Sequence, residues 1–454
     1  MLRRILIANR GEIALRIIRA CRELDMETIA IYSEADRESL HVKWADFAVC
    51  VGPAASSKSY LNAQNILAAA LSHGADGIHP GYGYLSESAL FAEMCEAHNL
   101  IFIGPTAGNI EFLGDKSRAK ATMQKAGVPV VPGSEGAVLD EASLIAIAEE
   151  IGYPVMIKAS AGGGGKGMRL ARDRRELLQG YHTARAEASA AFDNDQVYLE
   201  KLIEAPRHIE IQLLGDTFGN IVHFGERECS LQRRHQKLLE ECPSAVVSEA
   251  LRAEMGRAAV LGAKAVNYCN AGTMEFLLDA SGNFYFMEMN TRIQVEHPVT
   301  EMVYGIDLIK EQIRIAQGQR LGYDQGDIVP RGHAIECRIN AEEVRANSRP
   351  SPGVIEKLIV PGGYGIRWDS HAYQGYSISP FYDSMFAKLI AWGADRTAAI
   401  ETMQRALDEL TVEGIQTSIP FHRAILRDLR FRQGRFSTDF IQLWLEETEL
   451  SKQE

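Results

Sequence analysis

Residues 273–296, TMEFLLDASGNFYFMEMNTRIQVE, contain the clearest structural signal in the chain. Two apolar runs, Thr273–Leu278 and Phe284–Met289, flank a Ser-Gly pair, which is typical of a tight hairpin turn. A two-residue turn there places Glu275 directly opposite Glu288, with both side chains on one face of the sheet. Because opposed carboxylates repel each other, the hairpin predicts a neutralising cation, and a divalent ion such as Mg²⁺ fits best.

Polar residues recur at every other position along the second half of this stretch. An extended chain points alternate side chains to one face, so this row would project toward the predicted metal. A solvated edge strand also alternates, but it predicts mixed solubilising residues rather than this order of acid, amide, arginine, amide and acid. The row consists of Glu288, Asn290, Arg292, Gln294 and Glu296.

A glycine-rich loop, AGGGGKG, occupies residues 161–167. Gly167 stands where a Walker A loop needs Ser or Thr, so that motif is excluded. The loop lies between two predicted strands, Pro154–Ala159 and Met168–Ala171, whereas a helix follows the glycines of the Rossmann fingerprint. We interpret the loop as a flexible hairpin that folds over phosphates, with Lys166 adding positive charge. The alternative is a mobile turn without a ligand.

Strands and helices alternate in the N-terminal part of the chain, which predicts βαβ units and a parallel sheet. The turn at residues 79–87, HPGYGYLSE, follows one of these strands, and ligands bind at the carboxyl ends of parallel strands. Hairpins prevail from about residue 204 onward, so the fold class is α/β with an α+β character overall. The predicted N-terminal strands are Ile5–Ala8, Thr28–Tyr32, Phe47–Val51, Gly77–His79 and Leu100–Ile103, and the helices are Ile13–Leu24, Leu61–Ser72 and Glu87–His98.

The composition of the 454-residue chain excludes several function classes. Its formal net charge of −12 argues against general nucleic-acid binding, which needs a basic surface. The seven cysteines form no CxxC pair, which indicates reduced thiols and a cytoplasmic compartment. No apolar run approaches the length of a membrane span or a signal-peptide core. An anionic ligand therefore needs a local basic cluster, and residues 232–237, QRRHQK, supply one unless they form an exposed helix face.

Together these motifs resemble those of the biotin carboxylases, which are ATP-grasp enzymes of the biotin-dependent carboxylases. The resemblance covers essentially the whole chain and implies an ATP-grasp fold. The implied parts are an N-terminal parallel-sheet domain (1–113), an ATP-grasp domain (114–330) with a mobile lid (131–203), a β-rich C-terminal domain (331–446) and a tail (447–454). The motifs are ILIANRGEIA (5–14), HPGYGYLSE (79–87), GDK (114–116), KASAGGGGKGM (158–168), EKLIEAPRHIEIQ (200–212), QRRHQK (232–237), EMNTRIQVEHPVTE (288–301) and Arg338.

The resemblance implies a ligase that uses ATP and bicarbonate to form carboxyphosphate, whose CO₂ is then transferred to N1′ of biotin. Two divalent ions, Mg²⁺ or Mn²⁺, would be held by Glu275, Glu288 and Asn290. The implied ATP-binding residues are Lys116, Lys158, Gly162, Gly163, Gly164, Gly165, Glu200, Lys201, Leu202, Ile203, His208, Gln232, His235, Glu275 and Glu288.

The resemblance also assigns the remaining site residues. Glu296 would be the general base that deprotonates bicarbonate, and Arg338 would stabilise the biotin enolate. Lys237 and Arg292 would take part in catalysis as well. Bicarbonate would contact Lys237, Arg292, Gln294 and Val295, and biotin would contact Tyr82, Gly83, Glu87 and Arg338.

The sequence contains no Met-Lys dipeptide, the context in which the family attaches biotin. We therefore expect biotin on a separate carrier protein, and a stand-alone subunit of acetyl-CoA carboxylase that works with carboxyltransferase subunits in fatty-acid synthesis. Such subunits are usually homodimers, and we expect neither a nucleic-acid nor a membrane partner. The alternatives are a subunit of a pyruvate or another acyl-CoA carboxylase, a different ATP-grasp ligase, and an ATP-binding regulatory module without turnover.

Overall fold

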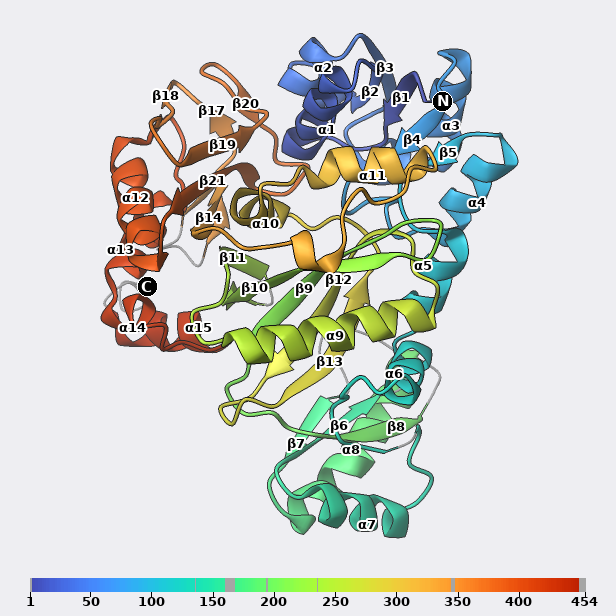
Figure 1. Cartoon of the computed structure of the whole chain (residues 1–454). Helices are drawn as coiled ribbons and strands as arrows, with labels where there is room; N and C mark the ends of the chain where they lie inside the picture. Colours follow the sequence, from blue (N-terminus) through green and yellow to red (C-terminus); the bar gives the residue numbers. More distant parts are fainter. Residues whose placement is uncertain are drawn as a thin grey trace.

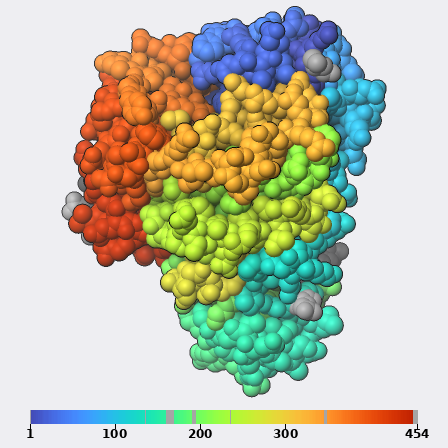
Figure 2. Space-filling view, in the orientation of Figure 1, coloured from blue at the N-terminus to red at the C-terminus, as the bar shows by residue number. Residues whose placement is uncertain are grey.

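A computed structural model describes residues 2–134, 136–159, 168–192, 195–234, 236–343 and 348–448. A long sheet lies at the centre of the molecule, and the described residues between 141 and 201 form a lobe at its lower end (Figure 1). The space-filling view shows the same lobe projecting from the main body (Figure 2). The predicted ATP-binding residues Gly162, Gly163, Gly164, Gly165 and His235 lie outside the described residues.

The N-terminal part of the chain forms a five-stranded parallel sheet, as the alternation of strands and helices predicts. Its elements are β1 (Arg4–Ile7), α1 (Gly11–Glu23), β2 (Glu27–Ser33), α2 (Leu40–Trp44), β3 (Phe47–Gly52), α3 (Ala63–Ser72), β4 (Gly77–His79), α4 (Ala89–Ala97) and β5 (Ile101–Phe102). The strand order is β3-β2-β1-β4-β5, and the five predicted strands and three predicted helices are confirmed, while α2 was not predicted. The central strands β1 and β4 are buried on both faces, as in other parallel sheets.

The lobe contains a three-stranded antiparallel sheet with the order β7-β6-β8. Its elements are α7 (Glu141–Ile151), β6 (Val155–Ala159), β7 (Met168–Ala171), α8 (Arg174–Phe192) and β8 (Val197–Lys201), and α5 (Ala107–Gly114) and α6 (Lys116–Lys125) precede it. Val155, Ile157, Leu177 and Leu199 belong to a hydrophobic cluster of the lobe's own. A separate core suits a segment that moves as one body, and the mobility of the lid stays a prediction.

An eight-stranded sheet joins the middle of the chain to its C-terminal part. In spatial order its strands are β13 (Phe284–Asn290), β12 (Asn270–Leu278), β9 (Arg207–Gly215), β10 (Ile221–Arg233), β11 (Gln236–Cys242), β14 (His333–Asn340), β21 (Met385–Gly393) and β19 (Ile366–Ser370). Because β14 pairs with β11, the sheet continues across the predicted domain boundary at residue 330. The basic run 232–237 lies where β10 turns into β11, so an exposed helix face is the wrong interpretation of it.

The hairpin of β12 and β13 contains the predicted Glu275–Glu288 pair, although its turn is longer than predicted. Glu275 lies opposite Glu288, but Leu278 pairs with Phe284, so the loop is longer than two residues. Asp279 closes this loop, since its Oδ1 accepts from the backbone N–H groups of Ser281 and Asn283, at 2.9 Å each. A register shift next to Glu275 then restores the predicted pair, because β13 carries one residue more than β12 there.

The remaining elements are helices, several of which pack against the large sheet, and short strands. The helices are α9 (Glu249–Ala265), α10 (His297–Tyr304), α11 (Leu308–Ala316), α12 (Arg396–Glu409), α13 (Ile419–Arg427), α14 (Leu429–Arg432) and α15 (Phe440–Glu447). The short strands are β15 (Glu342–Glu343), β16 (Arg349–Pro350), β17 (Gly353–Val354), β18 (Lys357–Ile359), β20 (Ser377–Ile378) and β22 (Thr411–Glu413). Within the part of the chain that the structure describes, no helix has the length and apolar character needed to cross a bilayer.

Candidate active site

A row of charged side chains crosses four neighbouring strands of the large sheet. In register, Glu288 on β13 faces Glu275 on β12, which faces Glu210 on β9, which in turn faces Arg227 on β10. Residues that are opposed in this way point to the same face. Three adjacent carboxylates on one face require cations, and Arg227 supplies the first, since its Nε lies 2.5 Å from Glu210 Oε1.

Lys237 is the second cation and lies at the centre of the site. Its Nζ is 2.6 Å from Glu210 Oε2, 3.0 Å from Glu275 Oε1 and 2.6 Å from Glu296 Oε1. These three contacts use all three protons of the ammonium group. Burial opposes the charge of Lys237, but the three carboxylates outweigh it and raise the pKa of this lysine well above its usual value. Lys237 is therefore a fixed cation that gathers carboxylates from three segments of the chain.

Glu296 lies at the N-terminus of α10. Its carboxylate contacts a second cation, Arg338 on β14, at a distance of 2.9 Å. Arg338 also contacts Glu240 on β11, with its Nε 2.6 Å from Glu240 Oε1. Burial opposes ionisation of Glu296, but the charges of Lys237 and Arg338 hold the pKa of Glu296 well below its usual value. We call Lys237, Glu210, Glu275, Glu296 and Arg338 the buried cluster.

A second group of charges, more open to solvent, lies toward the lobe. Lys158 on β6 and Lys120 on α6 both contact Glu200, with Nζ–carboxylate distances of 2.5 and 2.6 Å. Lys116 pairs with Glu288 at 2.7 Å, and the Lys116 side chain is 79% exposed. We call Lys116, Lys158, Glu200 and Glu288 the outer cluster. Lys116 in particular is open to an anionic ligand, whereas Lys158 is held by its ion pair with Glu200.

The remaining predicted ATP-binding residues are placed differently from one another. The side chain of Lys201 donates to the carbonyls of Gly152 and Tyr153, at 2.9 Å each, so it points into the lobe rather than toward the outer cluster. Gln232 lies opposite Lys237 in the β10–β11 hairpin. Leu202 and Ile203 directly follow β8 and are partly exposed.

The residues predicted to hold a metal form a suitable set of oxygen donors. Glu275 and Glu288 face each other, and Asn290 Nδ2 lies 2.9 Å from Glu275 Oε1. The amide of Asn290 therefore lies beside this pair of carboxylates. Two carboxylates and an amide oxygen are ligands that Mg²⁺ and Mn²⁺ accept, with phosphate oxygens and water completing the shell. The donor set fits the predicted ions.

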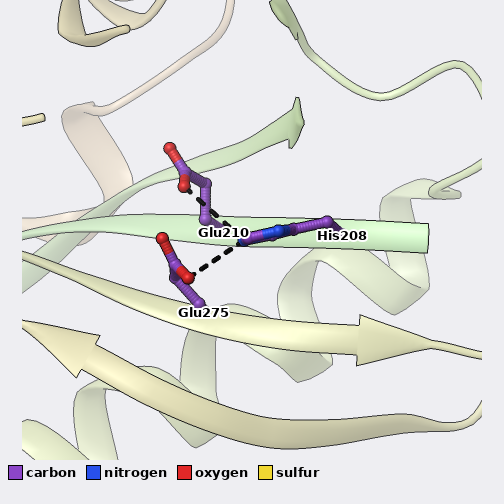
Figure 3. A group of neighbouring side chains, drawn as sticks. All are labelled: His208, Glu210 and Glu275. Atoms are coloured by element: carbon purple, nitrogen blue, oxygen red, sulfur yellow. Dashed lines mark ion pairs between the residues drawn. The ribbon is translucent and has the colours of Figure 1, made fainter. Parts of the chain in front are cut away.

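His208, Glu210 and Glu275 also lie close enough to suggest a metal site (Figure 3). His208 Nε2 is 3.1 Å from Glu275 Oε2 and 4.0 Å from Glu210 Oε2. Burial lowers the pKa of His208, but the charge of Glu275 outweighs this effect and raises it overall. Lys237 contacts both carboxylates and His208 contacts Glu275, so the members of this group already serve as partners for one another. This group therefore acts as an ion-pair network that orients Glu275.

The predicted biotin-contacting residues line the N-terminal side of the site. Glu87, in the turn after β4, accepts from Arg292 Nε at 2.9 Å. Arg292 also donates to Gln294 Oε1 at 2.8 Å. Tyr82 donates to Glu12 of α1, and Gly83 has a positive φ of 66° in the same turn. The turn thus meets the loop before α10 across a domain boundary.

The predicted straight row of five polar residues is wrong beyond Asn290. β13 ends at Asn290, and the chain reaches α10 through a turn, so Arg292, Gln294 and Glu296 do not lie on an extended strand. Arg292 reaches toward Glu87, whereas Glu296 reaches toward Lys237. The alternating polar side chains therefore point in two directions around a turn and do not share one face of a strand.

Comparison with known proteins agrees with this arrangement. Models for the biotin carboxylase N-terminal and C-terminal domains match residues 1–110 and 336–443, and the model for the carbamoyl-phosphate synthase L chain ATP-binding domain matches 115–323. A biotin carboxylase from Nostoc sp. is 60% identical over 439 residues, which cover 97% of this chain and 98% of that protein. The chain belongs to the biotin carboxylase family.

Other relatives extend the family beyond one carboxylase. A pyruvate carboxylase subunit from Methanothermobacter thermautotrophicus is 52% identical, over 97% of this chain and 90% of that protein. Among solved structures, the biotin carboxylase domain dimer of Hydrogenobacter thermophilus 2-oxoglutarate carboxylase, in complex with MgADP, ADP and bicarbonate, matches with a TM-score of 0.90 and 50% identity. That match covers 99% of this chain and 98% of that one.

Sequence reasoning missed several side chains of this biotin carboxylase site. Glu210 is two residues from His208 on β9, so the period of a strand already places both on one face. Lys120 lies one helical turn after Lys116 on α6, which is also a local signal. Glu240 had no local signal, because its contact with Arg338 depends on the pairing of β11 with β14.

Proposed function

We propose that this chain is an ATP-dependent ligase that carboxylates biotin with bicarbonate, giving carboxybiotin, ADP and phosphate. The observation that carries the proposal is the Lys237–Glu296–Arg338 arrangement, in which one buried carboxylate lies between two fixed cations. An ATP-binding protein without turnover has no need for a buried carboxylate held by two cations beside its metal-binding residues. Two cations facing one carboxylate suit a small anion that must be bound and deprotonated.

The outer cluster would bind the nucleotide phosphates. Lys116 and Lys158 provide the positive charge that phosphoryl transfer requires, and their present partners Glu288 and Glu200 keep them nearby. Mg²⁺ or Mn²⁺ held by Glu275, Glu288 and Asn290 would neutralise charge on the phosphates. Closure of the lobe would keep water away from carboxyphosphate.

The buried cluster would bind and activate bicarbonate. Lys237 and Arg292, with Gln294 and the Val295 backbone, would hold the anion, and its oxygen would attack the γ-phosphorus as ADP leaves. Glu296 would take the hydroxyl proton of bicarbonate. Because Lys237 and Arg338 lower the pKa of Glu296, we expect Glu296 to become a stronger base once bicarbonate draws one of these cations away. Arg338 would then be free to stabilise the biotin enolate.

The proposal includes partners that act outside this chain. Biotin would arrive on a separate carrier protein, Tyr82, Gly83 and Glu87 would line its approach, and carboxyltransferase subunits would use the carboxybiotin. We propose a homodimer that works in the cytoplasm as part of acetyl-CoA carboxylase. The sequence similarity to a pyruvate carboxylase subunit keeps a different final acceptor as the second candidate.

The test is ADP release by the purified chain with ATP, Mg²⁺ and bicarbonate, with and without free biotin. We expect turnover that depends on bicarbonate and rises with biotin. Glu296→Ala should lower kcat by about 10²–10⁴-fold, because it removes the general base. The control is Glu409→Ala, which removes an exposed carboxylate from a helix surface pair with Arg405 and should leave turnover unchanged.

The other outcomes separate the alternatives. Turnover that is indifferent to biotin would indicate another ATP-grasp ligase with a different acceptor. ATP binding without turnover, even with a biotinylated carrier present, would contradict the proposed function and favour a regulatory module. Reconstitution with the carboxyltransferase subunits and acetyl-CoA or pyruvate would identify the acceptor.

A further inference from the structure

A buried lysine in the C-terminal part of the chain takes no part in the roles assigned so far. Lys388 lies on β21, a strand that is otherwise apolar, and its side chain is inaccessible to solvent. Burying an ammonium group costs several kcal/mol unless partners compensate for the lost water, so an isolated buried lysine needs an explanation. The cost of burying Lys388 is higher still because of the residue that lies opposite it on the neighbouring strand.

Lys388 lies directly opposite Arg338 in the pairing of β14 with β21. On its other side it lies opposite Asp369 of β19. Arg338 and Lys388 are therefore like charges on one face of adjacent strands, an arrangement that is destabilising without neighbouring anions. A purely structural pair of positions would be filled at lower cost by apolar residues, so the two cations indicate a function at this place.

The contacts of Lys388 lead to the loop that carries the bicarbonate residues. Lys388 Nζ donates to the backbone oxygen of Val295 at 2.7 Å. This oxygen belongs to the peptide group that joins Val295 to Glu296. A peptide group is planar, so a hydrogen bond to its oxygen fixes the orientation of the whole group. It thereby constrains the backbone nitrogen and Cα of Glu296, from which the side chain extends. Lys388 thus acts on the backbone at the expected general base.

The other contact of Lys388 ties this backbone to the N-terminal domain. Nζ lies 3.0 Å from Glu12 Oε1 on α1, and Tyr82 donates to the same carboxylate. Val295, Lys388 and Glu12 come from three segments that lie far apart in the sequence. Glu12 therefore holds Lys388 on the side of the predicted biotin-contacting residues. Lys388 in turn holds the loop that carries the predicted bicarbonate-contacting residues.

We propose that Lys388 is a positioning residue that holds the Val295–Glu296 peptide in the orientation that bicarbonate requires. The proposal rests on the proposed function, because it takes Val295 and Glu296 as the bicarbonate-contacting residues. Lys388 touches no substrate in this account. It acts through the Val295 oxygen, with Glu12 as its charge partner.

The experiment measures KM for bicarbonate and KM for ATP separately, together with the thermal midpoint, in Lys388→Met. We expect KM for bicarbonate to rise about tenfold or more, with KM for ATP within about twofold of wild type, since the outer cluster is unaffected. A matched control is Arg396→Met, which removes a partly buried cation bound to a carboxylate, Glu241, and to backbone carbonyls, here those of Phe431 and Arg432. This control should lower the thermal midpoint without changing KM for bicarbonate.

A double variant separates positioning from folding. Glu12→Gln with Lys388→Met removes both charges of the pair, so the thermal midpoint should recover in part, although buried Glu336 and Asp369 also lose the charge of Lys388. The Val295 oxygen still lacks its donor, so KM for bicarbonate should stay raised. Values within twofold of wild type in both variants, or failure of both to fold, would overturn the proposal. A wild-type chain without bicarbonate-dependent turnover would instead overturn the proposed function and this role with it.

Discussion

The two clusters of the site differ in how far they are organised before any ligand arrives. In the buried cluster, Glu296 is 1% exposed and Lys237 13%, and each is fixed by at least two charged partners. In the outer cluster, Lys116 is 79% exposed and has Glu288 as its ion-pair partner. A fixed cluster suits a small anion that must be oriented for proton transfer, whereas an open one suits a large nucleotide whose own phosphates complete the site. The comparison predicts that substitutions in the two clusters will have different consequences.

The largest effect should follow from Lys237→Met. The substitution leaves Glu210, Glu275 and Glu296 buried without their common cation, and breaking a buried ion pair typically costs about 3–5 kcal/mol. The free energy of unfolding, measured by urea denaturation, should fall by about that amount, and turnover should be lost. A fall below about 1 kcal/mol would show that the buried cluster contributes little to the fold and would remove the contrast with the outer cluster.

A smaller, pH-dependent effect should follow from Glu336→Gln. Glu336 lies opposite Glu240, both carboxylates are buried, and three of their four oxygens have no hydrogen-bond partner. Burial raises the pKa of Glu336 well above its usual value, and burial raises that of Glu240 to about 7 despite Arg338. An acid whose pKa is higher in the folded state favours folding below its ordinary pKa and loses this contribution as pH rises through the folded value.

The glutamine variant should therefore be more stable than wild type at pH 8, by about 1 kcal/mol or more, because glutamine does not ionise and so escapes the penalty that the raised pKa of Glu336 places on folding. At pH 4 the difference should be much smaller, because a glutamate carboxyl is then mostly protonated in the unfolded chain as well as in the folded protein. The measurement is urea denaturation at several pH values. The difference in the free energy of unfolding between variant and wild type could instead be the same at pH 4 and pH 8. The Glu240–Glu336 pair would then bind no more protons in the folded protein than in the unfolded chain.

The smallest effect on stability should follow from Lys116→Met. An ion pair with so exposed a lysine contributes about 0–1 kcal/mol, so the thermal midpoint should hardly change. KM for ATP should nevertheless rise about tenfold, because one phosphate charge loses its partner. If the free energy of unfolding falls as far as in Lys237→Met, the outer cluster is as organised as the buried one and the distinction between them fails.

The parts of the fold that follow local rules could be predicted from the sequence. The parallel N-terminal sheet follows from alternating strands and helices, and its five strands lie within a few residues of their predicted positions. The pair Glu275–Glu288 was predicted correctly from a turn that is too short, because the longer loop and the register shift compensate for each other. Either deviation alone would have shifted the pairing of Glu275 by one residue.

The contacts that make the buried cluster could not be predicted in the same way. Lys237, Glu296 and Arg338 belong to β11, to the start of α10 and to β14, and only the strand order of the large sheet brings them together. Short-range patterns do not specify that order. Lys388 did leave a local sign, a lysine within the apolar run of β21, but the sign does not tell which backbone oxygen it meets.

The continuous eight-stranded sheet has a consequence for the biosynthesis of the protein. Strands β9 to β13 leave the ribosome well before β14, β19 and β21, which complete the sheet beyond β11. Until those strands emerge, Glu240 and Glu296 lack Arg338, and one edge of β11 has no neighbour. The nascent chain therefore carries an open edge at β11, and acids without Arg338, while residues 243–332 are translated, a state that invites chaperone protection and makes C-terminal truncation more damaging than its distance from Glu296 in the sequence suggests.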